Sequence, residues 1–95
     1  MAVAIEMNFK GATLDQYDQV IELMGLGGDA PSPPGALFHW VAKTDDGIRV
    51  VDVWETMEQF KKFSDEQIGP YTQQVGIPAP PEVTTYEVHN TLERT

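Results

Sequence analysis

A histidine and an aspartate in residues 36–60 are the first candidates for chemistry. His39 lies in the run ALFHWVAK, and Asp52 lies in the run GIRVVDVW. A carboxylate beside an imidazole orients the ring and makes it more basic, so the pair could act as a general base or acid. An isolated carboxylate is costly to bury, so we expect Asp52 to have a partner, and His39 is the nearest one. A purely structural hydrogen bond between them is the alternative.

Further candidates flank this pair in the sequence. Tyr71 follows a Gly-Pro pair; at the mouth of a cavity its phenol could donate a proton to an enolate or peroxide oxygen. Packing of a helix end is the alternative for Tyr71. His89 lies on the predicted last strand, and we expect it to be remote from His39. The candidates for substrate binding are Trp54, Leu37, Phe60 and Phe63.

Metal and nucleotide cofactors are not indicated by these residues. The chain has no cysteine, and it has no closely spaced pair of histidines of the kind that binds zinc. The glycines at 25, 27 and 28 follow a predicted helix, whereas the dinucleotide fingerprint follows a strand. We therefore expect no metal and no cofactor.

A β-hairpin must position the histidine and the aspartate. Two runs rich in β-branched and aromatic residues flank Asp45, Asp46 and Gly47, a pattern typical of a hairpin. A two-residue turn would place His39 opposite Trp54, whereas a four-residue turn over 44–47 would place it opposite Asp52. In both registers side chains alternate between two faces. One face holds Leu37, His39, Val41, Asp52 and Trp54, and the other holds Phe38, Trp40, Ala42, Val51 and Val53.

The remaining elements predict a ferredoxin-like α+β fold. Residues 3–9 alternate as a strand, and residues 25–35 form a long loop rich in glycine and proline. Between them, Thr13 and Gln16 form a capping box for a helix that ends at Gly25. Its buried stripe consists of Leu14, Tyr17, Val20, Ile21 and Met24. A second helix is expected from 56 to about 67, ended by Gly69 and Pro70 and followed by a short extra helical turn over 71–75, and a last strand is expected over 83–92. This order is the split βαβ arrangement, with four antiparallel strands and two helices on one face. Because the other face also carries apolar groups, we expect a homodimer.

Length and composition narrow the class of protein. Ninety-five residues suit a single domain over residues 1–95. The net charge of −9 disfavours nucleic acids and anionic membranes as partners. Residues 1–9 show neither a signal peptide nor a membrane span, so we expect a cytoplasmic protein.

The chain also resembles a known family. The run LFHWVAKTDDGIRVVDVWETMEQFKKF, the segment GIPAPPEV and the closing YEVHNTL are similar to small dimeric α+β barrel proteins related to the antibiotic biosynthesis monooxygenase group. The resemblance implies a dimer whose sheets form a barrel, with a ligand cavity between sheet and helices. Relatives include cofactor-independent oxygenases, haem-degrading enzymes and polyketide cyclases, so the family does not select one reaction. Of the Asn, Trp and Arg cluster of quinone-forming members, only the tryptophan is matched, at Trp54.

Two functional hypotheses follow. In the first, the protein is a cofactor-independent enzyme, monooxygenase-like or a cyclase or isomerase, that uses His39 and Asp52 for proton transfer on an aromatic or polyketide-like molecule. It predicts a deep apolar pocket lined by His39 and closed by the loop 25–35. In the second, the protein is a non-catalytic dimeric binding or interaction module. It predicts that Trp54, Phe60 and Phe63 fill the pocket.

Overall fold

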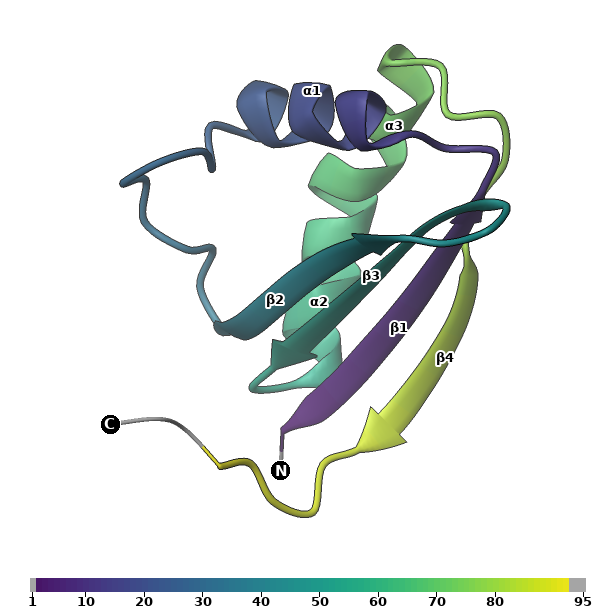
Figure 1. Ribbon diagram of the computed structural model, residues 1–95. Coiled ribbons are helices and arrows are strands. Elements are labelled where there is room, and N and C mark those ends of the chain that lie inside the picture. Colours follow the sequence, from purple (N-terminus) through teal and green to yellow (C-terminus); the bar gives the residue numbers. More distant parts are fainter. Residues whose placement is uncertain (1, 93–95) are drawn as a thin grey trace.

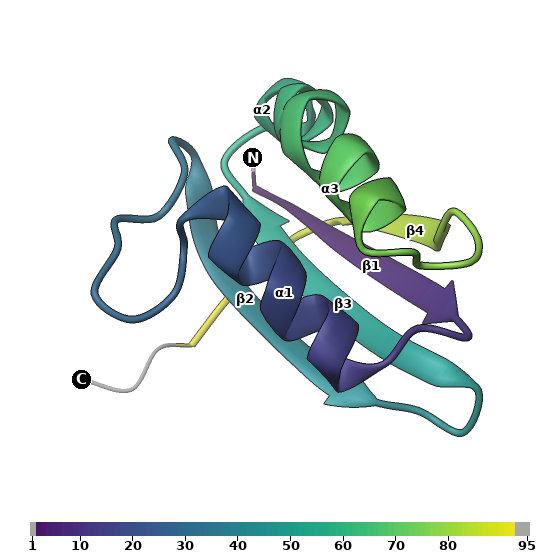
Figure 2. The same cartoon turned by 90° about the horizontal axis from the view of Figure 1, so that it is seen from above.

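A four-stranded antiparallel sheet with helices on one face makes up the fold (Figure 1). The computed structural model describes residues 2–92. Its elements are β1 (Val3–Lys10), α1 (Leu14–Met24), β2 (Ala36–Lys43), β3 (Gly47–Trp54), α2 (Met57–Phe63), the π-helical turn η1 (Ser64–Ile68), α3 (Gly69–Gln74) and β4 (Glu82–Glu87). The strand order β2-β3-β1-β4 places β2 and β4 at opposite edges. Figure 2 shows α1 and the α2–α3 segment side by side above the sheet. This is the predicted α+β ferredoxin-like fold.

The β2–β3 hairpin has the register of the four-residue turn. The Thr44 N–H donates to the Gly47 carbonyl over 2.9 Å. His39 consequently lies opposite Asp52 in the paired strands. Of the two registers left open by the sequence, this one brings the imidazole and the carboxylate onto adjacent positions of one face.

A β-bulge at the start of β2 changes the pairing at that end. The register shifts between Ala36 and Phe38, so Ala36 lies opposite Trp54. The prediction that Leu37 would lie opposite Trp54 is therefore wrong, because Ala36 takes that position. A bulge places an extra residue on one strand, and every side chain before it changes face.

Capping residues define α1 as the sequence predicts. The Thr13 hydroxyl accepts from the Gln16 backbone N–H, and the Gln16 side chain accepts from the Thr13 N–H. This reciprocal pair satisfies two of the unpaired donors at the start of a helix. Gly25 ends the helix with φ 72°, a left-handed conformation that glycine adopts without a steric penalty. Leu14, expected on the buried stripe, is 42% exposed.

The second helical segment differs from its prediction. Gly69 and Pro70 do not end it, because α2 widens into the π-helical η1 and continues as α3. The Gly69 N–H reaches back five residues to the Ser64 carbonyl. Pro70 is tolerated since it falls in the first turn of α3, where a missing N–H costs little. The extra turn expected over 71–75 is present in α3, but it continues the second helix without a break instead of following a stop near residue 67.

The last strand is shorter than predicted. β4 ends at Glu87, which pairs with Val3, the first residue of β1. One further bond joins the Val88 N–H to the Ala2 carbonyl. Residues 88–92 lie outside the sheet, since the pairing of β4 with β1 ends at Val3 and Glu87. The predicted strand of 83–92 is therefore wrong over its second half.

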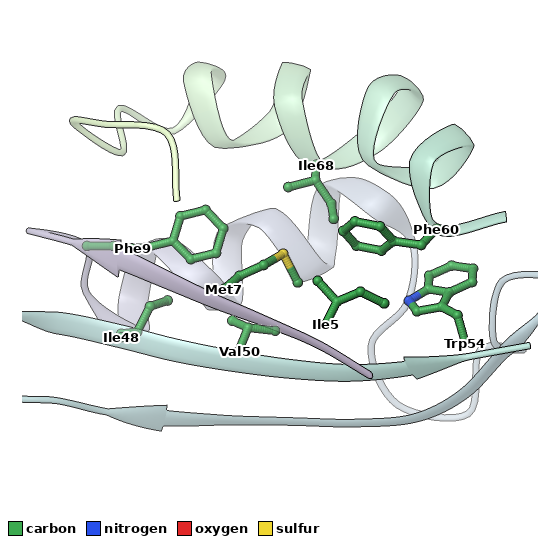
Figure 3. Packing of buried hydrophobic residues seen from close by; sticks show 9 residues of the cluster. Ile5, Met7, Phe9, Ile48, Val50, Trp54, Phe60 and Ile68 are labelled. Carbon is green, nitrogen blue, oxygen red and sulfur yellow. The ribbon is translucent and has the colours of Figure 1, made fainter. Parts of the chain in front are cut away.

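The core lies between the sheet and the helices. Side chains of β1 and β3 point up toward the α2–α3 segment, as Figure 3 shows. The β1 residues Ile5, Met7 and Phe9 are at most 4% exposed, as their alternation in the sequence predicts. The cluster is completed by Ala12, Ile48, Val50, Trp54, Phe60 and Ile68. Several side chains of this packed layer also line the candidate site.

Candidate functional site

A cavity of about 480 Å³ lies against the helix-covered face of the sheet. Its walls come from the inner faces of β1, β2 and β3, from α1, from the loop 25–35 and from residues 63–77. Pockets for small molecules usually measure about 300–1,000 Å³ and are mostly apolar with a few polar groups. The polar side chains in this wall are those of Tyr17, Ser32, His39, Asp52 and Thr72. The cavity therefore has the size and composition of a small-molecule site.

Three of these polar side chains are linked to one another in a chain of hydrogen bonds that ends at Trp54. His39 Nδ1 lies 2.6 Å from Asp52 Oδ1, and Trp54 Nε1 donates to Asp52 Oδ2 over 3.1 Å. On the other side of the ring, His39 Nε2 lies 2.5 Å from the Tyr17 hydroxyl. The Tyr17 and His39 rings also stack, with 12° between their planes. The hairpin register supplies three of the members, and α1 supplies the tyrosine.

The chemistry of the donors sets the positions of the protons. The Trp54 indole can only donate, and an ionised carboxylate can only accept. Asp52 is 5% exposed, so it needs both donors, and His39 must carry a proton on Nδ1 to supply the second one. In a neutral imidazole Nε2 is then an acceptor, and it accepts the hydrogen bond that the Tyr17 hydroxyl donates. The arrangement satisfies every polar atom and leaves Nε2 as the basic nitrogen.

Burial and charge keep Tyr17 protonated. Desolvation raises the pKa of the Tyr17 phenol above its usual value, and the nearby carboxylates of Asp52 and Asp18 raise the pKa further. Each of these effects disfavours the phenolate form. The phenol therefore stays protonated at neutral pH, and its hydroxyl can donate to His39 Nε2.

The structure brings some of the sequence-predicted site residues to the cavity and leaves others away from it. Trp54, Leu37 and Phe63 line it. Phe60 is buried beside Trp54, with ring centroids 6.0 Å apart (Figure 3), but does not line the cavity. Tyr71 on α3 is half-buried and is likewise absent from the lining.

His89 lies apart from this site, as expected. It follows β4, at the edge of the sheet opposite to the β2 strand that carries His39. Its side chain is exposed. The two histidines of the chain therefore do not share a site within one subunit.

Tyr17 is the member of the site that the sequence analysis did not single out. It was assigned to the buried stripe of the first helix, whose other members are apolar. Its hydroxyl is the one polar group in the stripe, and this was the sequence feature that could have marked Tyr17 as a site residue. A buried tyrosine hydroxyl usually has a hydrogen-bond partner, but the sequence could not show that the partner is His39.

Metal-binding clusters and membrane-spanning helices are both absent from the described residues. Within residues 2–92, no three His, Asp or Glu side chains come together in a group that could hold a metal ion. No helix in the same part of the chain is long and apolar enough to cross a membrane.

Comparisons with known proteins identify the fold. No family model and no curated protein sequence matches the chain. Among solved structures, a candidate antibiotic biosynthesis monooxygenase from Chloroflexus aurantiacus is similar, with 22% identity, a TM-score of 0.63 and 98% of each chain covered. SnoaB, a cofactor-independent oxygenase from Streptomyces nogalater, has 14% identity and a TM-score of 0.61 over 98% of this chain and 97% of its own. A monooxygenase from the gene ActVA-Orf6 of Streptomyces coelicolor, in complex with nanaomycin D, has 19% identity and a TM-score of 0.56 over 99% and 92%. The chain therefore has the ferredoxin-like α+β fold of antibiotic biosynthesis monooxygenase-like proteins.

Proposed function

We propose that the protein is a cytoplasmic, cofactor-independent enzyme of the monooxygenase-like type that acts on an aromatic or polyketide-like small molecule. The observation that carries the proposal is the Asp52–His39–Tyr17 chain on the wall of an apolar cavity. A base oriented by a carboxylate is the minimum that proton removal from an aromatic substrate needs. The fold shared with SnoaB and with the ActVA-Orf6 monooxygenase supports a monooxygenase-like reaction over other reaction types.

The reaction begins with proton transfer. His39 Nε2 accepts a proton from an acidic carbon or hydroxyl of the substrate, directly or through the Tyr17 hydroxyl that now occupies it. Asp52 stabilises the resulting imidazolium because its Oδ1 already accepts from Nδ1. An anthrone treated in this way becomes an electron-rich enolate. Reaction of that enolate with dioxygen gives an anthraquinone and one water, so that all four oxidising equivalents of dioxygen are accounted for.

A cyclase or isomerase reaction would use the same base without dioxygen. It would return the proton from His39 to another substrate atom. Oxygen consumption therefore separates the monooxygenase-like reaction from these two.

The test is oxygen uptake with a hydroxylated anthrone as substrate, corrected for the uncatalysed oxidation. The wild type is compared with His39→Gln, whose amide can still hydrogen-bond to Asp52, and with His89→Gln as the matched control outside the cavity. Loss of a general base costs about 10²–10⁴ in rate. We expect this loss for His39→Gln and none for His89→Gln. Equal oxygen uptake by the wild type and His39→Gln would contradict the proposal.

We also propose that the enzyme is a homodimer that pairs through the sheet face without helices. This face is apolar over β2 and β4, where Phe38 is 61%, Trp40 41% and Tyr86 52% exposed. Strand pairing brings Val51 and Val53 of β3 beside Trp40 and Phe38 on the same face. Apolar patches of this kind mark association surfaces on soluble proteins.

Sedimentation equilibrium tests the dimer. The wild type should sediment as a dimer, and Trp40→Glu should sediment as a monomer because a carboxylate would be buried in the interface. Leu23→Glu on α1, at an equally exposed position (40%) on the other side of the molecule, is the control. A monomeric wild type would exclude this assembly.

A further inference from the structure

No lysine or arginine side chain of residues 2–92 contributes to the cavity wall. All of these side chains are exposed. Arg49 is directed instead to Asn8, whose side-chain oxygen accepts from Arg49 Nε over 2.8 Å. The acidic side chain in the wall is Asp52, which is buried and held by two donors. With His39 in its neutral form, a ligand in this cavity therefore meets the Asp52 charge and no cation.

We propose that the cavity selects uncharged aromatic ligands that carry a phenolic hydroxyl and rejects aromatic carboxylates. This inference rests on the proposed function, whose substrate class it narrows. A carboxylate that enters the cavity loses its hydration and gains no counter-charge. Repulsion from Asp52 adds to this cost: at a separation of about 6 Å and an effective dielectric constant of about 20, it weakens binding on the order of a hundredfold.

The hydrogen-bonding groups of the wall explain the preference for a hydroxyl. The Tyr17 proton is engaged by His39 Nε2, so the free capacity of the Tyr17 oxygen is its acceptor lone pairs. The Thr72 hydroxyl donates to the Ile68 carbonyl over 2.7 Å and so also presents an acceptor. The Tyr17 and Thr72 oxygens thus offer acceptors, whereas the Ser32 hydroxyl, on the loop 25–35, can also donate. Beside Tyr17, a ligand group that donates a hydrogen bond therefore fits better than one that only accepts.

A phenol also suits the proposed chemistry. Its proton would lie against Tyr17, next to the basic nitrogen of His39. Around this polar corner the lining is apolar, with Val20, Ile21 and Met24 of α1 facing Ile48 and Val50 of β3 across the cavity. Such walls bind a flat ring system by apolar contact and leave the hydroxyl to orient it.

Isothermal titration with three matched ligands tests the inference at a pH where phenols are uncharged. The ligands are phenanthrol, its methyl ether and the phenanthrene carboxylate substituted at the same carbon. We expect phenanthrol to bind about three- to tenfold more tightly than the ether, because one hydrogen bond is lost. We expect it to bind about a hundredfold or more tightly than the carboxylate.

A variant that gains carboxylate binding tests the charge argument directly, because a damaged binding site could only lose affinity. Leu26 is half-buried and lines the cavity from the loop 25–35. Leu26→Arg would supply the missing cation and should improve carboxylate binding at least about tenfold. Leu23→Arg is the control, because Leu23 is on α1 but does not line the cavity.

The outcomes separate this inference from the function on which it rests. Carboxylate binding equal to phenanthrol binding would overturn the charge selection and leave a ligand-binding cavity in place. An ether that binds as tightly as phenanthrol would overturn the hydroxyl preference. If none of the three ligands binds, both the inference and the proposed aromatic substrate are wrong.

Discussion

Replacing Asp52 with asparagine should leave the fold in place and remove the base. An asparagine has one acceptor oxygen and one donor amide where the aspartate has two acceptors. Its oxygen can keep the bond from Trp54 Nε1, while its amide donates to His39 Nδ1. The imidazole must then carry its proton on Nε2, which becomes a donor to the Tyr17 oxygen. Both partners of residue 52 remain bonded, but the Tyr17 hydroxyl proton loses its acceptor and Nε2 can no longer accept a proton.

The size of each effect follows from the same bonds. Asp52 accepts two charge-assisted hydrogen bonds, at 2.6 and 3.1 Å. Replacing two such bonds with neutral ones costs about 2–3 kcal/mol, and relief from burying a charge offsets part of it. We expect a net loss of about 1–2 kcal/mol in the free energy of unfolding, or a fall in Tm of roughly 4–16 °C for a domain of this size. The rate should fall much further, by about 10²–10⁴, because the general base is lost.

Two spectroscopic measurements follow the proton itself. Nitrogen chemical shifts of labelled His39 should show the proton on Nδ1 in the wild type and on Nε2 in Asp52→Asn. Ultraviolet titration should show that the pKa of Tyr17 falls toward its ordinary value in the variant. The Asp52 charge no longer raises that pKa, and a donating Nε2 stabilises the phenolate. A Tyr17→Phe difference spectrum isolates this signal from the other two tyrosines of the chain.

Specific results would refute the reasoning. If the proton of His39 stays on Nδ1 in Asp52→Asn, the hydrogen-bond assignment is wrong. If the tautomer changes but activity is retained, His39 is not the base. Loss of folding would show that the carboxylate is structurally indispensable, contrary to the compensation described above.

Three further predictions concern stability. Trp54→Phe removes the donor to the buried Oδ2 of Asp52 and should lower the free energy of unfolding by about 1–3 kcal/mol, as urea denaturation would show. Because the pKa of Tyr17 is raised in the folded state, the folded protein holds that proton more tightly. Stability should therefore fall as pH rises above about 10, and Tyr17→Phe should lack this part of the fall in thermal melts across that range. Gly47→Ala would place a Cβ 2.0 Å from the Phe9 carbonyl oxygen, so it should destabilise the protein by about 2–4 kcal/mol, and an unchanged Tm would contradict the close strand approach.

The fold was largely predictable because its signals are local. The alternation of Ile5, Met7 and Phe9 and the capping pair of Thr13 and Gln16 each depend on residues close in the sequence. The end of β4 was not predictable in this way, because it depends on where β1 begins. The continuation of the helix through Pro70 was also missed, since a π-helical turn has no clear sequence signature.

The candidate site was predictable only in its hairpin half. Side-chain alternation placed His39 and Asp52 on one face, but turn length had to decide whether they were opposite each other. Tyr17 lies on another element, and its approach to His39 depends on how α1 crosses the sheet. Likewise, Tyr71 and Phe60 were expected at the cavity from their place in the sequence, but Phe60 packs against Trp54 in the core and Tyr71 is not part of the cavity lining.

The central claim is that His39 removes a proton from an aromatic molecule bound in the cavity. The most direct measurement is solvent deuterium exchange into the methylene group of a hydroxylated anthrone, followed by proton NMR under argon so that no oxidation interferes. The account predicts that the wild type accelerates exchange over buffer and that His39→Gln and Asp52→Asn reduce this acceleration by about 10²–10⁴. Exchange at the buffer rate with the wild type, while the anthrone is shown to bind, would contradict the claim and favour a non-catalytic binding protein.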